Sequence, residues 1–209
     1  MKIKSVIFDM DGVLIDAKDW HYDALNKALE LFGFSISRYD HLTTYDGLPT
    51  KKKLEMLSLE SELPTELHAF INEMKQKYTM EMVYTQCRPQ FIHEYALSVL
   101  KSRGYSLAVA SNSVRETVNI MMEKSSLKKY LDEIVSASDV INPKPHPEIY
   151  QVTMEKLGCL PEECLIIEDN QNGIKAARAS GAHVLEVRDI YEVNLTNIES
   201  YISKIEEAI

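Results

Sequence analysis

Two carboxylates stand two residues apart directly after an apolar run near the amino terminus. Residues 6–8 lead into Asp9 and Asp11, and Gly12 follows at once. In an extended chain, residues two apart point to the same side, so the two carboxylates would lie together. Burying them without partners costs free energy. A hard divalent cation held by carboxylate, carbonyl and water oxygens removes that cost, and Mg²⁺ is the ion that we expect there.

Three more groups of polar residues follow apolar runs later in the chain. Ser111 and Asn112 end one run, and Glu168 and Asp169 end another. Between them, Lys144 stands between two prolines, which restrict its backbone and aim it in one direction. Each group has a plainer explanation, because an Asp-x-Asp-Gly sequence is usually a turn and Ser-Asn often caps a helix. Their repeated position after apolar runs favours a shared site.

The elements that would position these residues follow from the hydrophobic pattern. Five apolar runs alternate with helical patterns, which predicts an α/β fold with three layers, a Rossmann-like parallel sheet between helices. The expected strands lie near Ile3–Phe8, Ser106–Ala110, Ile134–Ala137, Leu165–Ile167 and His183–Glu186. Ligands of such sheets bind beyond the carboxyl ends of the strands. The four polar groups would therefore meet in one crevice.

Two local signals complete the expected layout. Ser113 and Glu116 match a capping box, which predicts a helix that begins at Val114, directly after a strand. Earlier in the chain, a helical block interrupts the strand-and-helix alternation, with a loop expected at residues 38–50. We expect this block, residues 17–83, to be an inserted α-helical cap. The α/β core would then consist of residues 1–16 and 84–209.

Three residues of the helical block could face a ligand. His21 lies on the apolar stripe of its helix, where a histidine is more often a core residue than a ligand. Thr50 is positioned to cap the next helix, and Lys51 begins a lysine triplet that is more often a solvated face. The sequence leaves open which of them faces the crevice.

The crevice would contain acids for a cation, one positioned lysine, and hydroxyl and amide donors. This set suits a phosphoryl group, because the cation and Lys144 would neutralise its oxygens while donors near Ser111 bind them. Asp9 could attack phosphorus and form an aspartyl phosphate, which water then hydrolyses. Asp11 could protonate the leaving oxygen and later deprotonate the water.

Together these residues resemble the motifs of the haloacid dehalogenase (HAD) superfamily, in particular its phosphatase and β-phosphoglucomutase-like branch with a helical cap of the C1 type. Phe-Asp-Met-Asp-Gly-Val-Leu-Ile-Asp at residues 8–16 is similar to the first motif, and Ser111-Asn112 to the second. Lys144-Pro145 is similar to the third motif and Glu168-Asp169 to the fourth. The four motifs occur in order, and the resemblance covers essentially the whole chain.

The resemblance implies a division of labour among the acids. Asp9 would be the nucleophile and a metal ligand, and Asp11 the acid and base as well as a ligand through its carbonyl oxygen. Asp169 would be a further ligand of Mg²⁺. Glu168 would either bind the ion or stand behind its ligands.

The resemblance also implies how a phosphoryl group would be bound. Ser111, Asn112 and Lys144 would contact its oxygens, and Gly12 would let backbone amides approach it closely. One departure concerns Thr50, which stands followed by lysines where phosphoglucomutase-like relatives have an arginine. This departure weighs against a mutase.

We therefore expect a Mg²⁺-dependent phosphatase that hydrolyses a small phosphomonoester, such as a sugar, polyol or amino-alcohol phosphate, with His21, Thr50 and Lys51 as candidate contacts to the leaving group. One alternative is a phosphomutase acting on a sugar phosphate. An alternative of another class is a catalytically idle domain of the same fold that binds a partner.

The overall composition limits the other partners. A net charge of −9 argues against nonspecific binding to nucleic acid or to an anionic membrane, because both require a positive field. The acids interrupt the first apolar run before it could serve as a signal sequence, and the three cysteines match neither a disulfide framework nor a zinc site. We expect a cytoplasmic protein that is a monomer or a weak homodimer.

Overall fold

The structure is a computed structural model that describes residues 2–45 and 47–207. The chain forms two compact units. One consists of the residues up to Asp16 together with those from Cys87 onward, and the other is Ala17–Gln86. No helix in these described ranges is long and apolar enough to cross a membrane.

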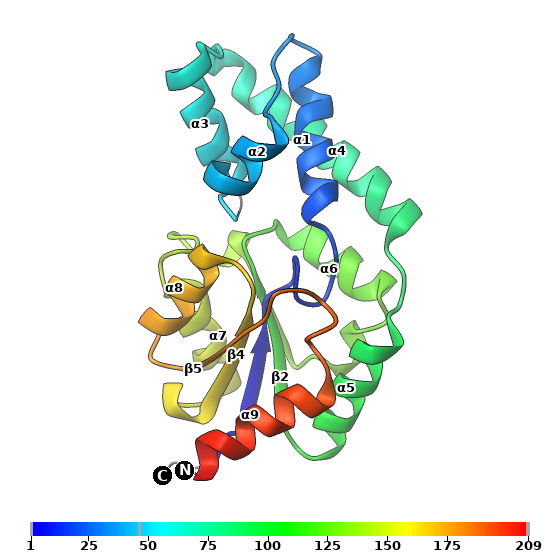
Figure 1. The fold of residues 1–209 in the computed structure, drawn as a ribbon, viewed down its shortest axis with the longest axis vertical. Coiled ribbons are helices and arrows are strands. Elements are labelled where there is room, and N and C mark those ends of the chain that lie inside the picture. Colours follow the sequence, from blue (N-terminus) through cyan, green and yellow to red (C-terminus); the bar gives the residue numbers. More distant parts are fainter. Residues whose placement is uncertain (1, 46, 208–209) are drawn as a thin grey trace. The chain divides into compact units, whose positions relative to one another are not determined.

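The first unit is built on a parallel five-stranded sheet in the order β3-β2-β1-β4-β5 (Figure 1). Its strands are β1 (Ser5–Phe8), β2 (Ser106–Ser111), β3 (Glu133–Ser136), β4 (Cys164–Glu168) and β5 (His183–Glu186). The central strand β1 is buried on both faces, as its unbroken apolar run requires. The predicted α/β class is confirmed. At their carboxyl ends β2 and β4 extend further than expected, so Ser111 and Glu168 are themselves strand residues.

Helices cover both faces of this sheet. They are α5 (Phe91–Ser102), α6 (Arg115–Lys124), α7 (Glu148–Leu157), α8 (Gln171–Ala179) and α9 (Leu195–Glu207), with short helical turns η3 (Lys128–Tyr130), η4 (Ala137–Asp139) and η5 (Pro161–Glu163). The chain steps from β1 to β2 and β3 in one direction and then crosses to β4 and β5 in the other. Because such crossovers are right-handed, α5 and α6 cover one face, and α7 and α8 the opposite face (Figure 1).

The α7–α8 side holds a continuous core between helices and sheet. Ile7 of β1 and Ile166 of β4 pack there with Ile149 and Tyr150 of α7. Since side chains alternate along a strand, the residues two positions after Ile7 and Ile166 point to this same side.

The second unit is entirely helical in its described part. It contains α1 (Lys18–Glu30), α2 (Arg38–Asp40), η1 (His41–Tyr45), α3 (Thr50–Ser61), η2 (Thr65–Leu67) and α4 (His68–Gln86). Its buried core joins α1, α3 and α4 through residues that include Leu25, Leu29, Leu54 and Ile71. The loop expected at residues 38–50 was wrong in part, because α2 and η1 form there; Ser37 caps α2 by accepting a hydrogen bond from the Asp40 N–H.

Two boundaries of this unit also differ from the expectation. Thr50 does not cap α3; Pro49 precedes the helix with no side-chain cap, and Thr50 is its first residue. At the other end, α4 runs to Gln86, beyond the predicted limit at Val83. It stops shortly before Pro89, whose ring cannot continue a helix.

Candidate active site

The carboxyl ends of β1 and β4 bring two acids to the same side of the sheet. Asp9 follows β1 and continues the alternation that Ile7 begins, and Glu168 ends β4 in line with Ile166. Register links the strands directly, since Phe8 pairs with Ile167. Asp9 and Glu168 are buried, with exposed fractions of 8% and 1%. Such acids require cationic or hydrogen-bonding partners.

Lys144 supplies that partner for both acids. Its Nζ donates to Asp9 Oδ1 at 2.5 Å and to Glu168 Oε1 at 2.8 Å. The lysine side chain is only 4% exposed, which is rare for a lysine and requires ion pairing of this kind. The structure therefore brings together three of the residues that the sequence singled out.

Asn112 holds the loop that carries Lys144. Its side-chain Oδ1 accepts from the Lys144 N–H at 3.1 Å, and its Nδ2 donates to the Lys144 carbonyl at 3.3 Å. The Lys144–Pro145 peptide bond is cis. In the structure the Asn112 side chain pairs with the backbone of Lys144, and its expected contact with a phosphoryl group stays a prediction. This pairing fixes the direction of the lysine.

Both carboxylate oxygens of Glu168 accept hydrogen bonds. Oε1 accepts from Lys144 and from the hydroxyl of Tyr150 at 2.9 Å. Oε2 accepts from the N–H groups of Asp169 at 2.8 Å and Asn170 at 3.0 Å. Gly173 of α8 leaves the room that the carboxylate needs, because a Cβ there would lie 1.6 Å from Oε1. The Glu168 carboxylate therefore accepts from four donors and holds the groups that carry them in place.

Asp11 lies in a tight turn beside the second motif. Its Oδ2 accepts from the hydroxyl of Ser113 at 3.1 Å. Gly12 has a φ of 91°, which other residues rarely adopt, and its N–H donates to the Ile15 carbonyl at 2.7 Å. The glycine thus shapes the turn that presents Asp11, and its own amide is already paired within that turn.

The predicted capping box at Ser113 was wrong. Helix α6 begins at Arg115, with Val114 preceding it and no side-chain cap. The Ser113 hydroxyl donates to Asp11 instead, and its N–H donates to Ser111 Oγ at 3.0 Å. Ser111 is 1% exposed. A partner from the distant first motif replaces the local cap that the spacing predicted.

Acidic side chains outnumber basic ones around Asp9. Burial raises the pKa of Asp9 well above its usual range; the Lys144 ammonium opposes this, and neighbouring carboxylates add to it. For Lys144, burial lowers the pKa, but Asp9 and Glu168 outweigh it, so the lysine remains an ammonium. Burial also raises the pKa of Tyr150 and keeps its hydroxyl a neutral donor. An excess of buried negative charge favours binding of a further cation.

The acids can provide that cation with ligands. Carboxylate oxygens of Asp9, Glu168 and Asp169 lie within 4.8 Å of one another, close enough to share an ion. All three offer hard oxygen donors, which Mg²⁺ prefers. The residues present therefore fit the expected ion.

Two residues that contact the candidate site, Tyr150 and Ser113, were not among the site residues predicted from the sequence. Tyr150 could have been found, because the pattern of Ile149, Tyr150, Thr153 and Met154 places it on the buried face of α7. A tyrosine hydroxyl buried in a core needs a polar partner. Ser113 carried no signal beyond a common cap.

The residues predicted for ligand contact in the second unit have different environments there. His21 is half-buried, and its Nδ1 lies 3.3 Å from Nζ of the buried Lys75 on α4. Thr50 is half-buried and Lys51 is exposed. The solvated-face interpretation fails for the third lysine of the triplet, Lys53, which is 7% exposed. A role for His21, Thr50 and Lys51 in ligand binding stays a prediction.

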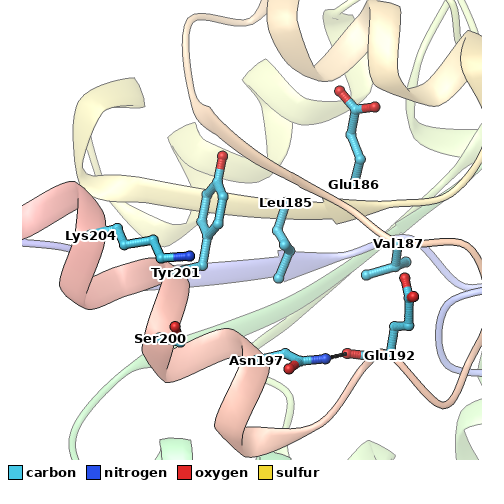
Figure 2. A pocket seen from close by; sticks show the side chains of 8 residues that line it. All are labelled: Leu185, Glu186, Val187, Glu192, Asn197, Ser200, Tyr201 and Lys204. Atoms are coloured by element: carbon cyan, nitrogen blue, oxygen red, sulfur yellow. Dashed lines mark hydrogen bonds between the residues drawn. The ribbon is translucent and has the colours of Figure 1, made fainter.

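A separate pocket lies between β5 and α9 (Figure 2). Its lining includes Glu186, Tyr201 and Lys204, and the Asn197 side chain donates to the Glu192 carbonyl at 2.9 Å. The polar groups singled out from the sequence are not among its lining residues. The candidate site is therefore the acid–lysine cluster at the carboxyl edge of the sheet.

Known proteins are similar to this chain over most of its length. The family model described as haloacid dehalogenase-like hydrolase matches residues 6–187. A phosphorylated carbohydrates phosphatase of Thermotoga maritima is 30% identical over 182 residues, which is 86% of this chain and 82% of that protein. A phosphoglycolate phosphatase of Aquifex aeolicus is 32% identical over 181 residues, covering 86% and 82%.

The fold has a close counterpart among solved structures. A β-phosphoglucomutase of Clostridium difficile superposes with a TM-score of 0.83 at 22% identity, covering 98% of this chain and 99% of the other. The family match spans the segment that contains Asp9, Lys144 and Glu168. The chain belongs to the haloacid dehalogenase-like hydrolases.

Proposed function

We propose that the protein is a Mg²⁺-dependent phosphatase that hydrolyses a small phosphomonoester through an aspartyl phosphate on Asp9. The observation that carries this proposal is the buried contact of 2.5 Å between Lys144 Nζ and Asp9 Oδ1. A cation held against a buried carboxylate neutralises the approach of an anionic phosphoryl group to an anionic nucleophile. Named phosphatases among the relatives support the same reaction class.

The reaction would proceed in two displacements. An oxygen of Asp9 attacks phosphorus, the bond from phosphorus to the leaving oxygen breaks, and Asp11 gives its proton to that oxygen. A water molecule then attacks phosphorus, transfers a proton to Asp11 and releases inorganic phosphate from Asp9. The hydrogen bond from Ser113 to Asp11 orients the carboxyl group for both transfers.

Asp9, Asp169 and the Asp11 carbonyl would hold the ion in this proposal. Bound Mg²⁺ would supply charge neutralisation for the phosphoryl oxygens and lower the pKa of Asp9. Glu168 is assigned to the residues that hold Lys144, because its two oxygens already accept from four donors.

The proposed substrate is a sugar, polyol or amino-alcohol phosphate. The relatives named as phosphatases of phosphorylated carbohydrates and of phosphoglycolate support a small polar substrate. The helical unit, Ala17–Gln86, is assigned the role of a cap from its place in the sequence between the first two motifs. His21, Thr50 and Lys51 are its candidate contacts to the leaving group.

The proposal is tested with a panel of phosphomonoesters. Phosphate released from each ester is measured with Mg²⁺ present and again after the Mg²⁺ is chelated. We expect turnover that disappears on chelation and returns with added Mg²⁺. Asp9→Asn should abolish turnover, whereas Glu155→Gln, a charge-neutralising change at an exposed position of α7, should leave it unchanged. Wild-type turnover by Asp9→Asn would overturn the assignment of the nucleophile.

The same panel separates the alternatives. A phosphomutase would convert a hexose phosphate into its isomer in the presence of a sugar bisphosphate and release little phosphate. A domain that only binds a partner would turn over none of the esters and would form a stable complex in a pull-down experiment. Phosphate as the sole product excludes both.

A further inference from the structure

Tyr150 contacts both members of the ion pair between Lys144 and Glu168, whose lysine also binds Asp9. It is fully buried on α7, and its hydroxyl donates to Glu168 Oε1 at 2.9 Å. The Nζ of Lys144 lies 4.7 Å from the centre of the Tyr150 ring. The tyrosine therefore touches the carboxylate through its hydroxyl and the ammonium through its ring.

The hydroxyl is not needed to fill the core. Ile149 and Met154 of the same helix pack beside Tyr150 with purely apolar side chains, and a phenylalanine ring would occupy the same volume. A buried hydroxyl costs free energy unless it is hydrogen-bonded, so its presence here calls for a role beyond packing. Its partner, Glu168, indicates what that role is.

We propose that Tyr150 is a positioning residue that acts through Glu168 to leave the Lys144 ammonium available to Asp9 and to a phosphoryl group. This inference rests on the proposed phosphatase function. With the tyrosine donor present, the charge of Glu168 Oε1 is shared between two donors. Without it, Glu168 attracts the ammonium more strongly, and less of the ammonium charge acts on a bound phosphate.

The test compares two variants that each lose one tyrosine hydroxyl. Tyr150→Phe removes the donor to Glu168, and Tyr201→Phe removes a hydrogen bond of 2.7 Å to the Val184 carbonyl, away from the acid–lysine cluster. Binding of inorganic phosphate in the presence of Mg²⁺ is measured by calorimetry, and melting temperature is measured for both. Neither measurement depends on turnover.

We expect Tyr150→Phe to weaken phosphate binding about fivefold, the effect of one hydrogen bond, while Tyr201→Phe binds phosphate as the wild type does. Both variants should lose a similar amount of thermal stability. The effect of Tyr150→Phe should disappear when Glu168 is already changed to glutamine, because the tyrosine acts through that carboxylate.

The outcomes distinguish the two proposals. Wild-type phosphate affinity in Tyr150→Phe overturns the role of Tyr150 and leaves the phosphatase standing. Phosphate binding by the wild type without turnover of any ester overturns the phosphatase alone. A wild type that binds no phosphate with Mg²⁺ present overturns both.

Discussion

Nζ of Lys144 and Oδ1 of Asp9 lie 2.5 Å apart although 135 positions separate the two residues in the chain. Both are buried, and Glu168 Oε1 accepts from the same ammonium at 2.8 Å. A single cation thus serves two carboxylates that come from two neighbouring strands of the sheet. Its removal should affect both chemistry and stability.

Lys144→Met should lower turnover of a phosphomonoester such as p-nitrophenyl phosphate by about a hundredfold or more, the usual effect of losing one charge-stabilising donor. It should also lower the free energy of unfolding by about 3–5 kcal/mol, because two buried acids lose their cation. Steady-state kinetics and urea unfolding measure these effects. Lys156→Met, at an exposed position of α7, is the control, and equal turnover in the two variants contradicts the prediction.

Ser113→Ala should slow turnover several-fold, because Asp11 loses the hydroxyl that orients it, and one neutral hydrogen bond is worth about 0.5–1.5 kcal/mol. The effect should appear in kcat, since Ser113 contacts the proposed acid and base. Ser102→Ala removes a comparable hydroxyl on the surface of α5, where it donates to the Val99 carbonyl. If the two variants have the same kcat, the role assigned to Ser113 is wrong.

Gly173→Ala should be destabilising although alanine favours helices. The added Cβ would lie 1.6 Å from Glu168 Oε1, so the carboxylate must move. Overpacking of this kind costs about 1–3 kcal/mol, more than the gain of up to about 1 kcal/mol in helix propensity. Urea unfolding measures the net change, and turnover should fall with it. Lys175→Ala, exposed on the same helix, should be neutral or stabilising, and the same result for Gly173→Ala would show that α8 adapts.

His93 should make the protein less stable on the acid side of neutrality. It is fully buried on α5, where its Nε2–H donates to the Ile190 carbonyl at 2.7 Å. Burial lowers the pKa of His93 below its usual 6.5, and its backbone hydrogen bonds oppose this only in part. Below pH 6.5 the unfolded chain therefore binds a proton that the folded chain excludes, and stability falls until the folded pKa is reached.

The contribution of His93 to this slope is at most about 1.4 kcal/mol per pH unit, the value for one proton. Urea unfolding between about pH 7 and pH 5 should give a shallower dependence for His93→Gln than for the wild type. Equal slopes in His93→Gln and the wild type would remove His93 as the cause.

The sequence by itself determined the class of fold and the residues worth testing. The hydrophobic runs predicted the strands, because parallel strands that are buried on both faces consist mainly of apolar residues. The rule that ligands bind at the carboxyl ends of such strands then singled out Asp9, Lys144 and Glu168. The expected fold is confirmed because it depends on local patterns and on one general property of parallel sheets, and the roles of the three residues stay predictions.

Only the tertiary structure decided how those residues pair. Asn112 binds the backbone of Lys144, Ser113 binds Asp11 in place of a local cap, and Tyr150 donates to Glu168. In each of these pairs, the two residues come from different segments of the chain. A hydrogen bond requires alignment within a few tenths of an ångström, which spacing along a sequence does not specify. Packing of α7 against the sheet specifies it for Tyr150, and turns at the strand ends specify it for Asn112 and Ser113.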